Sequence, residues 1–256
     1  AAGMAYEGAH PVVALYATFL NRAFDQLLMD VALHRAGVTV VLDRAGITGA
    51  DGASHNGVWD IAMCSLIPGI RLAAPRDEDT LRAELRDALD VDDALTVLRY
   101  RKGSLPDPMP ALRADGGVDV LLDEAGAESS PKVLIVGTGA CAPDAIEAGR
   151  RLAADGIGVT VVDPRWLLPL SQRLVGMAAG YDAVISVEDG IVRGGFGWAL
   201  RDGLTQAATP VYCLGVPQVF PEHGERAQMI ADFGYDADGI ERAARAAVSA
   251  LGAREG

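Results

Sequence analysis

The sequence contains no long apolar run, few aromatic residues, few cysteines and an excess of acidic over basic side chains. No apolar stretch approaches the ~18 residues of a membrane-spanning helix, so we expect no membrane partner. The cysteines Cys64, Cys141 and Cys213 are far apart and form no CxxC pair, so we predict no disulfide framework, no metal site and a location in the cytosol. A net charge of −13 argues against binding to nucleic acid.

What remains is a chain of small apolar residues in which strand-length and helix-length segments alternate. Half of the residues are hydrophobic while only 5% are aromatic, which suits helices packed closely on a parallel sheet. We predict strands over 10–17, 38–42, 70–75, 93–100, 131–139, 157–165, 182–189 and 209–217. Helices are expected over 18–37, 59–67, 77–91, 142–156, 167–180, 194–207 and 236–252.

This alternation predicts two three-layer α/β domains with mainly parallel sheets. The first would cover residues 1–102 and the second residues 132–256. The segment 103–131 between them contains GSLPDPMP and DGG, which is typical of a linker, although VDVLLDEAG within it can form an edge strand or a hairpin.

Two short motifs of the second half allow more than one interpretation. The turn VGTGACA (136–142), followed by Asp163 after the next strand, loosely matches a dinucleotide-binding fingerprint, but we favour a packing turn without a ligand, since this pattern is common at tight βα turns. Glu188 and Asp189 are adjacent on a predicted strand and therefore point to opposite faces. A packing or interface role is at least as compatible with these two carboxylates as a shared catalytic site.

A third motif, DRAGITGADGASHNG (43–57), is the best candidate for a functional site. It follows the carboxyl end of a predicted parallel strand, where open α/β sheets bind their ligands. Arg44 can bind a phosphate or a carboxylate, and Asp51 and His55 are close enough in sequence to act together in proton transfer. Tyr16 and Phe19, after the neighbouring strand, can supply an aromatic wall. The pattern predicts an anion-binding pocket, with a purely structural loop as the alternative.

Several long motifs, in this order along the chain, carry a resemblance to a known family. They are YATFLNRAFDQ, DRAGITGADGASHNG, IPGIRLAAPRDE, LRYRKGS, VTVVDPRWLLPL and VISVEDGIVRGGFG. Together they resemble 1-deoxy-D-xylulose-5-phosphate synthase, a transketolase-like enzyme that uses thiamine diphosphate. The resemblance implies a transferase that condenses pyruvate with D-glyceraldehyde 3-phosphate, with loss of CO2, in the synthesis of isoprenoid and thiamine precursors.

The same resemblance implies a role for each candidate residue. Phe19 would stack on the aminopyrimidine of the cofactor, and Asp51 and His55 would orient the substrate and move protons. The acceptor's phosphate would be bound by three side chains, Tyr16, Arg44 and Lys102. In LRYRKGS the family usually has a proline where this chain has Arg101. This difference puts the phosphate-binding role of the next residue, Lys102, in question.

The resemblance also implies that part of the enzyme lies outside these residues. The chain resembles most of the pyrimidine-binding domain and all of the C-terminal domain, and the first residues, AAGMAYEGAHP, suggest that a longer protein has been cut. The family's GIAEQH motif, with its cofactor-activating Glu, and the domain that binds the diphosphate and Mg2+ are not among the 256 residues. We therefore expect a homodimer that needs this further domain, and an isolated fragment that is inactive. A non-catalytic dimerisation or assembly module and a nucleotide-binding module are the alternatives.

Overall fold

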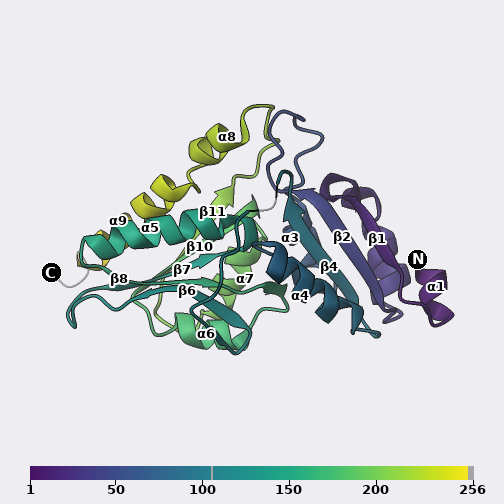
Figure 1. The fold of residues 1–256 in the computed structure, drawn as a ribbon, viewed down its shortest axis with the longest axis horizontal. Helices are drawn as coiled ribbons and strands as arrows, with labels where there is room; N and C mark the ends of the chain where they lie inside the picture. The colour runs from purple at the N-terminus through teal and green to yellow at the C-terminus, as the bar shows by residue number, and fades with distance from the viewer. Residues whose placement is uncertain (105, 253–256) are drawn as a thin grey trace.

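The computed structural model describes residues 1–104 and 106–252 and contains two mainly parallel β-sheets covered by helices (Figure 1). The first sheet has the order β1-β2-β4-β3-β9, in which only β9 runs antiparallel to its neighbour. Its strands are β1 (Val12–Tyr16), β2 (Val38–Ala45), β4 (Leu95–Arg101), β3 (Arg71–Ala73) and β9 (Trp166–Leu168). The predicted fold class, with two mainly parallel α/β domains, is confirmed.

The second sheet has the order β11-β10-β7-β8-β6-β5. Its central strands are parallel, whereas β6 and β5 form an antiparallel hairpin at one edge. Its strands are β11 (Val211–Val216), β10 (Ala183–Ile191), β7 (Lys132–Gly137), β8 (Gly158–Asp163), β6 (Val118–Glu124) and β5 (Arg113–Asp115). Part of the segment between the predicted domains is therefore joined to the second sheet.

Helices cover both sheets, and their ends follow local sequence signals. In Figure 1 the helices α5 (Ala142–Ala154) and α9 (Ala237–Gly252) lie on one face of the second sheet, and α6 (Gln172–Ala178) and α7 (Phe196–Gly203) on the other. On the first sheet, α4 (Glu78–Leu89) begins after Asp77, whose side chain accepts from the backbone N–H of Thr80 and thereby caps the helix. The remaining α-helices are α1 (Ala2–Tyr6), α2 (Phe24–Gln26), α3 (Asp60–Cys64) and α8 (Arg226–Phe233), and a short 3-10 helix, η3 (Gly139–Cys141), precedes α5.

The prediction of one regular helix over residues 18–37 is wrong. The segment begins as a 3-10 helix, η1 (Ala17–Arg22), and later becomes a π-helix, η2 (Leu27–Ala32). Ala23 lies between η1 and α2 with φ −105° and ψ 4°, which is outside the helical region and interrupts the hydrogen-bond pattern. The apolar spacing predicts which side chains are buried, such as Leu27 and Val31, but it does not reveal this change of helix type.

The prediction of a helix over residues 167–180 is wrong at its beginning. Trp166–Leu168 form β9, which pairs with β3 and so joins the first sheet although it follows the second domain's β8 in sequence. Leu168 precedes Pro169, and a residue before proline favours extended backbone. The helix α6 begins only after Ser171, whose hydroxyl accepts from the N–H of Leu174.

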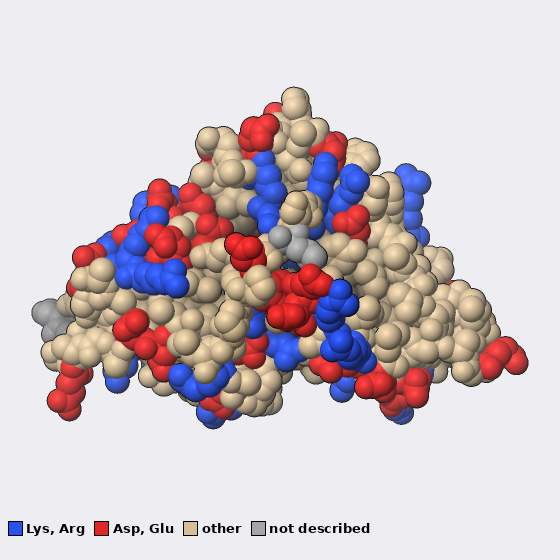
Figure 2. All heavy atoms as spheres, viewed as in Figure 1, with Lys and Arg blue, Asp and Glu red and all other residues tan. Residues whose placement is uncertain are grey.

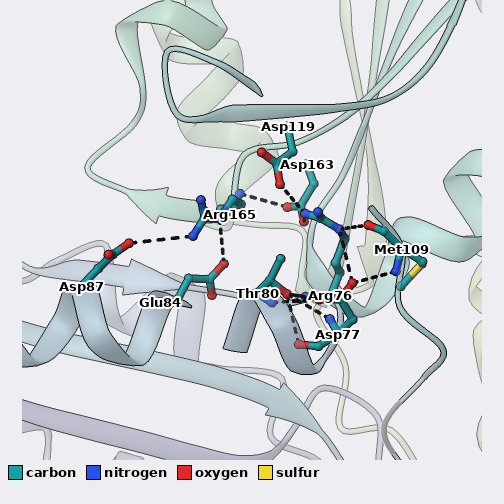
Figure 3. A network of polar contacts seen from close by, with 9 residues as sticks. All are labelled: Arg76, Asp77, Thr80, Glu84, Asp87, Met109, Asp119, Asp163 and Arg165. Carbon is teal, nitrogen blue, oxygen red and sulfur yellow. Dashed lines mark hydrogen bonds and ion pairs between the residues drawn. The ribbon is translucent and has the colours of Figure 1, made fainter. Parts of the chain in front are cut away.

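A buried ionic network joins the two domains (Figure 3). Arg76, two residues before α4, donates to Asp119 on β6 at 2.7 Å and to Asp163 on β8 at 3.0 Å. The Arg76 side chain is 4% exposed and that of Asp163 is 0% exposed. In a dinucleotide-binding site an acidic residue at the position of Asp163 would contact a ribose, but the ion pair with Arg76 buries this carboxylate. Gly139, in the turn before α5, packs against the carbonyl oxygen of Ala74. Packing therefore explains the motif 136–142.

The surface carries charges of both signs. On the face drawn in Figure 2 acidic and basic side chains are interspersed, and the coloured residues there form no continuous basic area. Among residues 1–104 and 106–252, no helix has the length and apolar character needed to cross a membrane.

Candidate functional site

The segment 43–57, called the site loop below, is an ordered loop closed at its base by two backbone hydrogen bonds. Gly46 and Gly57 each donate an N–H to the other's carbonyl oxygen, at 2.8 and 2.9 Å. Inside the loop, the Asn56 side chain accepts from the N–H of Thr48 at 2.9 Å and donates to the carbonyl of Gly52 at 3.2 Å. Asn56 thus supplies the contacts that a loop of this length needs in order to keep one shape.

Two aromatic residues form a wall beside the site loop. Tyr16 ends β1 and Phe19 lies in η1, and their rings stack with centroids 5.7 Å apart. The Phe19 ring meets the His55 ring edge-on at 6.2 Å and is 49% exposed. The guanidinium carbon of Arg44 lies over the Tyr16 ring at 4.1 Å from its centroid, a cation–π contact. The structure therefore brings these four predicted residues together.

The two remaining predicted residues, Asp51 and Lys102, complete the cluster. Lys102 Nζ, directly after β4, donates to Asp51 Oδ2 at 2.7 Å, and Arg44 Nη1 lies 3.5 Å from the same oxygen. The bond from Lys102 is the main cause that lowers the pKa of Asp51 below its ordinary value of 3.8. Asp51 is therefore a carboxylate at neutral pH that balances part of the positive charge of Arg44 and Lys102.

His55 is held by its neighbours in the loop. Its Nδ1 lies 2.9 Å from Ser54 Oγ, and Thr18 of η1 donates to the Ser54 carbonyl oxygen at 2.8 Å. The backbone N–H of His55 donates to the Gly52 carbonyl at 3.0 Å. These contacts orient the imidazole toward the aromatic wall, where a proton donor or acceptor can reach a bound molecule.

Arg44 has a buried donor that the described residues leave without a partner. Its Nε forms no hydrogen bond there, and the nearest carboxylate oxygen, Asp43 Oδ2, lies 3.7 Å away. Its backbone has a positive φ of 61°, which is uncommon for a residue with a side chain. An unpaired guanidinium donor beside a second cation is suited to binding a phosphate or carboxylate.

Arg101, the residue that departs from the family's proline, does not disturb this geometry. It is the last residue of β4 and pairs with Ala45 of β2. Its side chain makes a long contact of 3.4 Å with the carbonyl of Ser104. Lys102 reaches Asp51 without any proline before it, so the position of the basic group is set by the strand.

Models of two protein families match almost the whole chain. The transketolase pyrimidine-binding domain matches residues 1–108, and the transketolase C-terminal domain matches residues 126–240. The chain therefore consists of two domains of the transketolase type. Curated relatives named 1-deoxy-D-xylulose-5-phosphate synthase are 52% identical in Corynebacterium glutamicum, over 94% of this chain, and 54% identical in Clavibacter sepedonicus, also over 94%. The chain spans 39% and 37% of these two relatives' lengths.

Solved structures agree with this assignment. A structure titled as an inactive beta4 tetramer of a split-gene transketolase is 27% identical, with a TM-score of 0.84, over 97% of this chain and 80% of that one. A mutant transketolase from Pichia stipitis matches in fold, with a TM-score of 0.75 at 19% identity, over 93% of this chain and 34% of that one.

In this transketolase C-terminal domain, the adjacent carboxylates Glu188 and Asp189 have separate roles, as their positions on one strand predict. Glu188 accepts from the N–H groups of Phe196 and Gly197 at 2.9 Å each, at the start of α7. Burial raises the pKa of Glu188 to about 7, although these two donors act in the opposite direction. Asp189 points instead to the site loop, a contact that sequence reasoning missed; the motif VEDG was its only signal.

Proposed function

We propose that this chain is the part of a thiamine diphosphate-dependent synthase that binds the acceptor substrate. The enzyme would condense pyruvate with D-glyceraldehyde 3-phosphate to 1-deoxy-D-xylulose 5-phosphate and release CO2. The observation that carries the proposal is the convergence of Tyr16, Phe19, Arg44, Asp51, His55 and Lys102 around one loop. Relatives at 50–54% identity that are named for this synthase support the choice of reaction.

The residues present fit one side of the cofactor. The half-exposed Phe19 ring offers an apolar surface on which an aminopyrimidine can stack. When bound, thiamine diphosphate supplies the electron sink for decarboxylation and carbon–carbon bond formation. Among residues 1–104 and 106–252, no group of three or more His, Cys, Asp or Glu could hold a metal ion. We assign Mg2+ and the diphosphate to a further domain that the remaining length of the relatives provides.

The chain's own residues would bind the aldehyde acceptor and move its protons. Arg44 and Lys102 bind the phosphate, which takes the place of Asp51 as their partner, while the Tyr16 ring stacks on the guanidinium and limits its movement. Asp51, once released from Lys102, is available for a substrate hydroxyl. His55, held at Nδ1 by Ser54, exchanges a proton through Nε2 with the oxygen of the acceptor's carbonyl group.

An assembly role is the second candidate, because a structure that this chain matches over 80% of that structure's length is titled as an inactive tetramer. In that case the 256 residues have no turnover alone and contribute a surface to a larger assembly. Both candidates include a homodimer. We also propose the cytoplasm as the location, since all three cysteines are free thiols.

A chimeric enzyme tests the proposal. The matching C-terminal part of the Corynebacterium glutamicum synthase, 52% identical over 245 residues, is replaced by this chain, and product and CO2 are measured with both substrates. We expect turnover in the chimera, and a loss of about 100-fold or more in its His55→Ala variant, because general acid–base catalysis contributes that much.

The result that contradicts the proposal is equally specific. A chimera that is folded and assembles like the parent enzyme, but makes no product, would favour the assembly role. Unchanged turnover in His55→Ala would remove His55 from the mechanism while leaving the function intact.

A further inference from the structure

Two residues of the second domain, Asp189 and Arg226, contact both polar backbone atoms of Ile47 in the site loop. The Ile47 N–H donates to Asp189 Oδ1 at 3.1 Å, and Arg226 Nε donates to the Ile47 carbonyl oxygen at 3.1 Å. Arg226 Nη2 also donates to Asp189 Oδ2 at 3.0 Å, so the two side chains and the peptide groups form a closed set of bonds. The Asp189 side chain is 1% exposed and that of Arg226 is 26% exposed.

The surroundings fix Asp189 in this position. Tyr235, itself buried, donates its hydroxyl to Asp189 Oδ1 at 2.9 Å, and Arg99 donates to the Asp189 carbonyl oxygen at 2.7 Å. The carboxyl group lies so close to Gly46 that a Cβ there would come within 2.0 Å of it. A carboxylate with three donors in a buried place holds one geometry, because any rotation would leave buried donors unpaired.

The contact extends along the loop that precedes α8. In Figure 1 the site loop lies beside this segment, and Asn56 Nδ2 donates to the Pro221 carbonyl oxygen at 3.1 Å. Gly224 N–H reaches the Gly49 carbonyl at 3.4 Å. The site loop, which belongs to the first domain, therefore contacts the second domain at Ile47, Gly49 and Asn56.

We propose that the Asp189–Arg226 pair is a positioning device that sets the geometry of the acceptor site from the second domain. Arg44 lies two residues before Gly46 and has an unfavourable backbone conformation, which persists only where the surrounding structure enforces it. The pair enforces it by fixing the backbone at Gly46 and Ile47. Its effect on catalysis rests on the proposed function, whereas its effect on the loop does not.

Substitution of Arg226 separates this role from general stability. Arg226→Met keeps an unbranched side chain but removes both donors, so the Ile47 carbonyl and Asp189 lose their partner. Arg165→Met is the matched control: Arg165 is also partly exposed, at 22%, and lies 3.4 Å from the fully buried Glu84, but it does not contact the site loop. Asp189→Asn is a second test variant, because its amide would present a donor to the donor of Arg226.

The first measurement is amide hydrogen exchange in the 256-residue chain. We expect exchange of residues 46–57 to rise about tenfold or more in Arg226→Met and Asp189→Asn, since a lost charge-assisted bond shifts local opening by that factor. Exchange in β7 should stay unchanged, and Arg165→Met should leave the site loop protected. Equal protection of residues 46–57 in all four proteins would overturn the proposal.

The second measurement uses the chimeric synthase. Arg226→Met should raise KM for D-glyceraldehyde 3-phosphate about tenfold while KM for pyruvate changes less than about twofold, because the displaced groups bind the acceptor. Arg226→Lys, which keeps the charge but offers a single donor group, should recover part of the loss. A loop that exchanges faster with no change in the ratio of the two KM values would refute the positioning role. A chimera inactive with the wild-type residues would instead refute the proposed function and leave the exchange result standing.

Discussion

Replacement of Arg76 by Met should destabilise the protein strongly, and in a way that depends on pH. Arg76 is the counterion of Asp163, whose side chain is 0% exposed, and of Asp119, whose side chain is 10% exposed. Removal of one partner of a buried ion pair typically costs about 3–5 kcal/mol, because the remaining charge is left without compensation. The backbone N–H of Arg165 still donates to Asp163 at 2.9 Å, so we expect the lower end, about 3 kcal/mol at neutral pH.

The pH dependence follows from the direction of the pKa shift. Burial raises the pKa of Asp163 above 3.8, while Arg76 acts to lower it. Removal of the Arg76 guanidinium would therefore raise the pKa of Asp163 further. A carboxyl group whose pKa is higher in the folded protein loses stability as pH rises through the window between the unfolded and folded values. The destabilisation by Arg76→Met should therefore be small near pH 4 and reach its full size above the raised pKa.

Urea unfolding at pH 5 and pH 8 measures both effects, with Arg76→Met/Asp163→Asn as the control. The double variant has no buried charge at position 163, so we expect it to recover about 1 kcal/mol or more at pH 8. A loss that is the same at both pH values, or a double variant no more stable than the single one, would refute the reasoning. Arg76 would then act through packing and not through charge.

Three further predictions concern single side chains. In the chimeric synthase, Arg44→Met should raise KM for D-glyceraldehyde 3-phosphate about 10- to 100-fold, as expected for a lost charge-assisted contact to phosphate, and an equal rise for pyruvate would speak against the assignment. Glu84 is buried, its Oε2 has no partner among the described residues, and burial raises its pKa well above 4.5, so stability falls as pH rises above that value. Glu84→Gln should remove this fall in stability, which urea midpoints measured over a range of pH would detect. A pH profile of the variant that matches that of the parent protein would contradict the prediction. Gly46→Ala should cost about 1–3 kcal/mol more than Gly69→Ala, because both have a positive φ but only Gly46 faces the Asp189 carboxyl group, and equal losses in thermal unfolding would contradict this.

The fold could be predicted from the sequence to a large extent, because burial on both faces of a parallel strand produces apolar runs that need no tertiary information. The predicted strands over 38–42 and 131–139 became β2 and β7, and the helix predicted from residue 77 became α4, which begins at Glu78. The helix over 18–37 and the start of the helix over 167–180 were predicted wrongly for different reasons. Helix type in η1 and the pairing of β9 with β3 depend on contacts with distant segments, which periodicity does not contain. The start of α6 after Ser171 has local signals, Pro169 and the capping hydroxyl, which the apolar periodicity alone did not take into account.

For the candidate site, the sequence by itself determined which residues are available: a glycine-rich loop at a strand end, with Arg44, Asp51 and His55 within it and an aromatic pair nearby. Local chemistry was sufficient for that, because side-chain type and position at a strand end limit what a residue can bind. Only the tertiary structure decided that Lys102 pairs with Asp51 and that Asp189 and Arg226 hold Ile47. These pairs are 51, 142 and 179 residues apart in sequence. The first is brought together by the pairing of β2 with β4 within the first sheet, and the other two by the packing of the two domains, so no local preference reveals them.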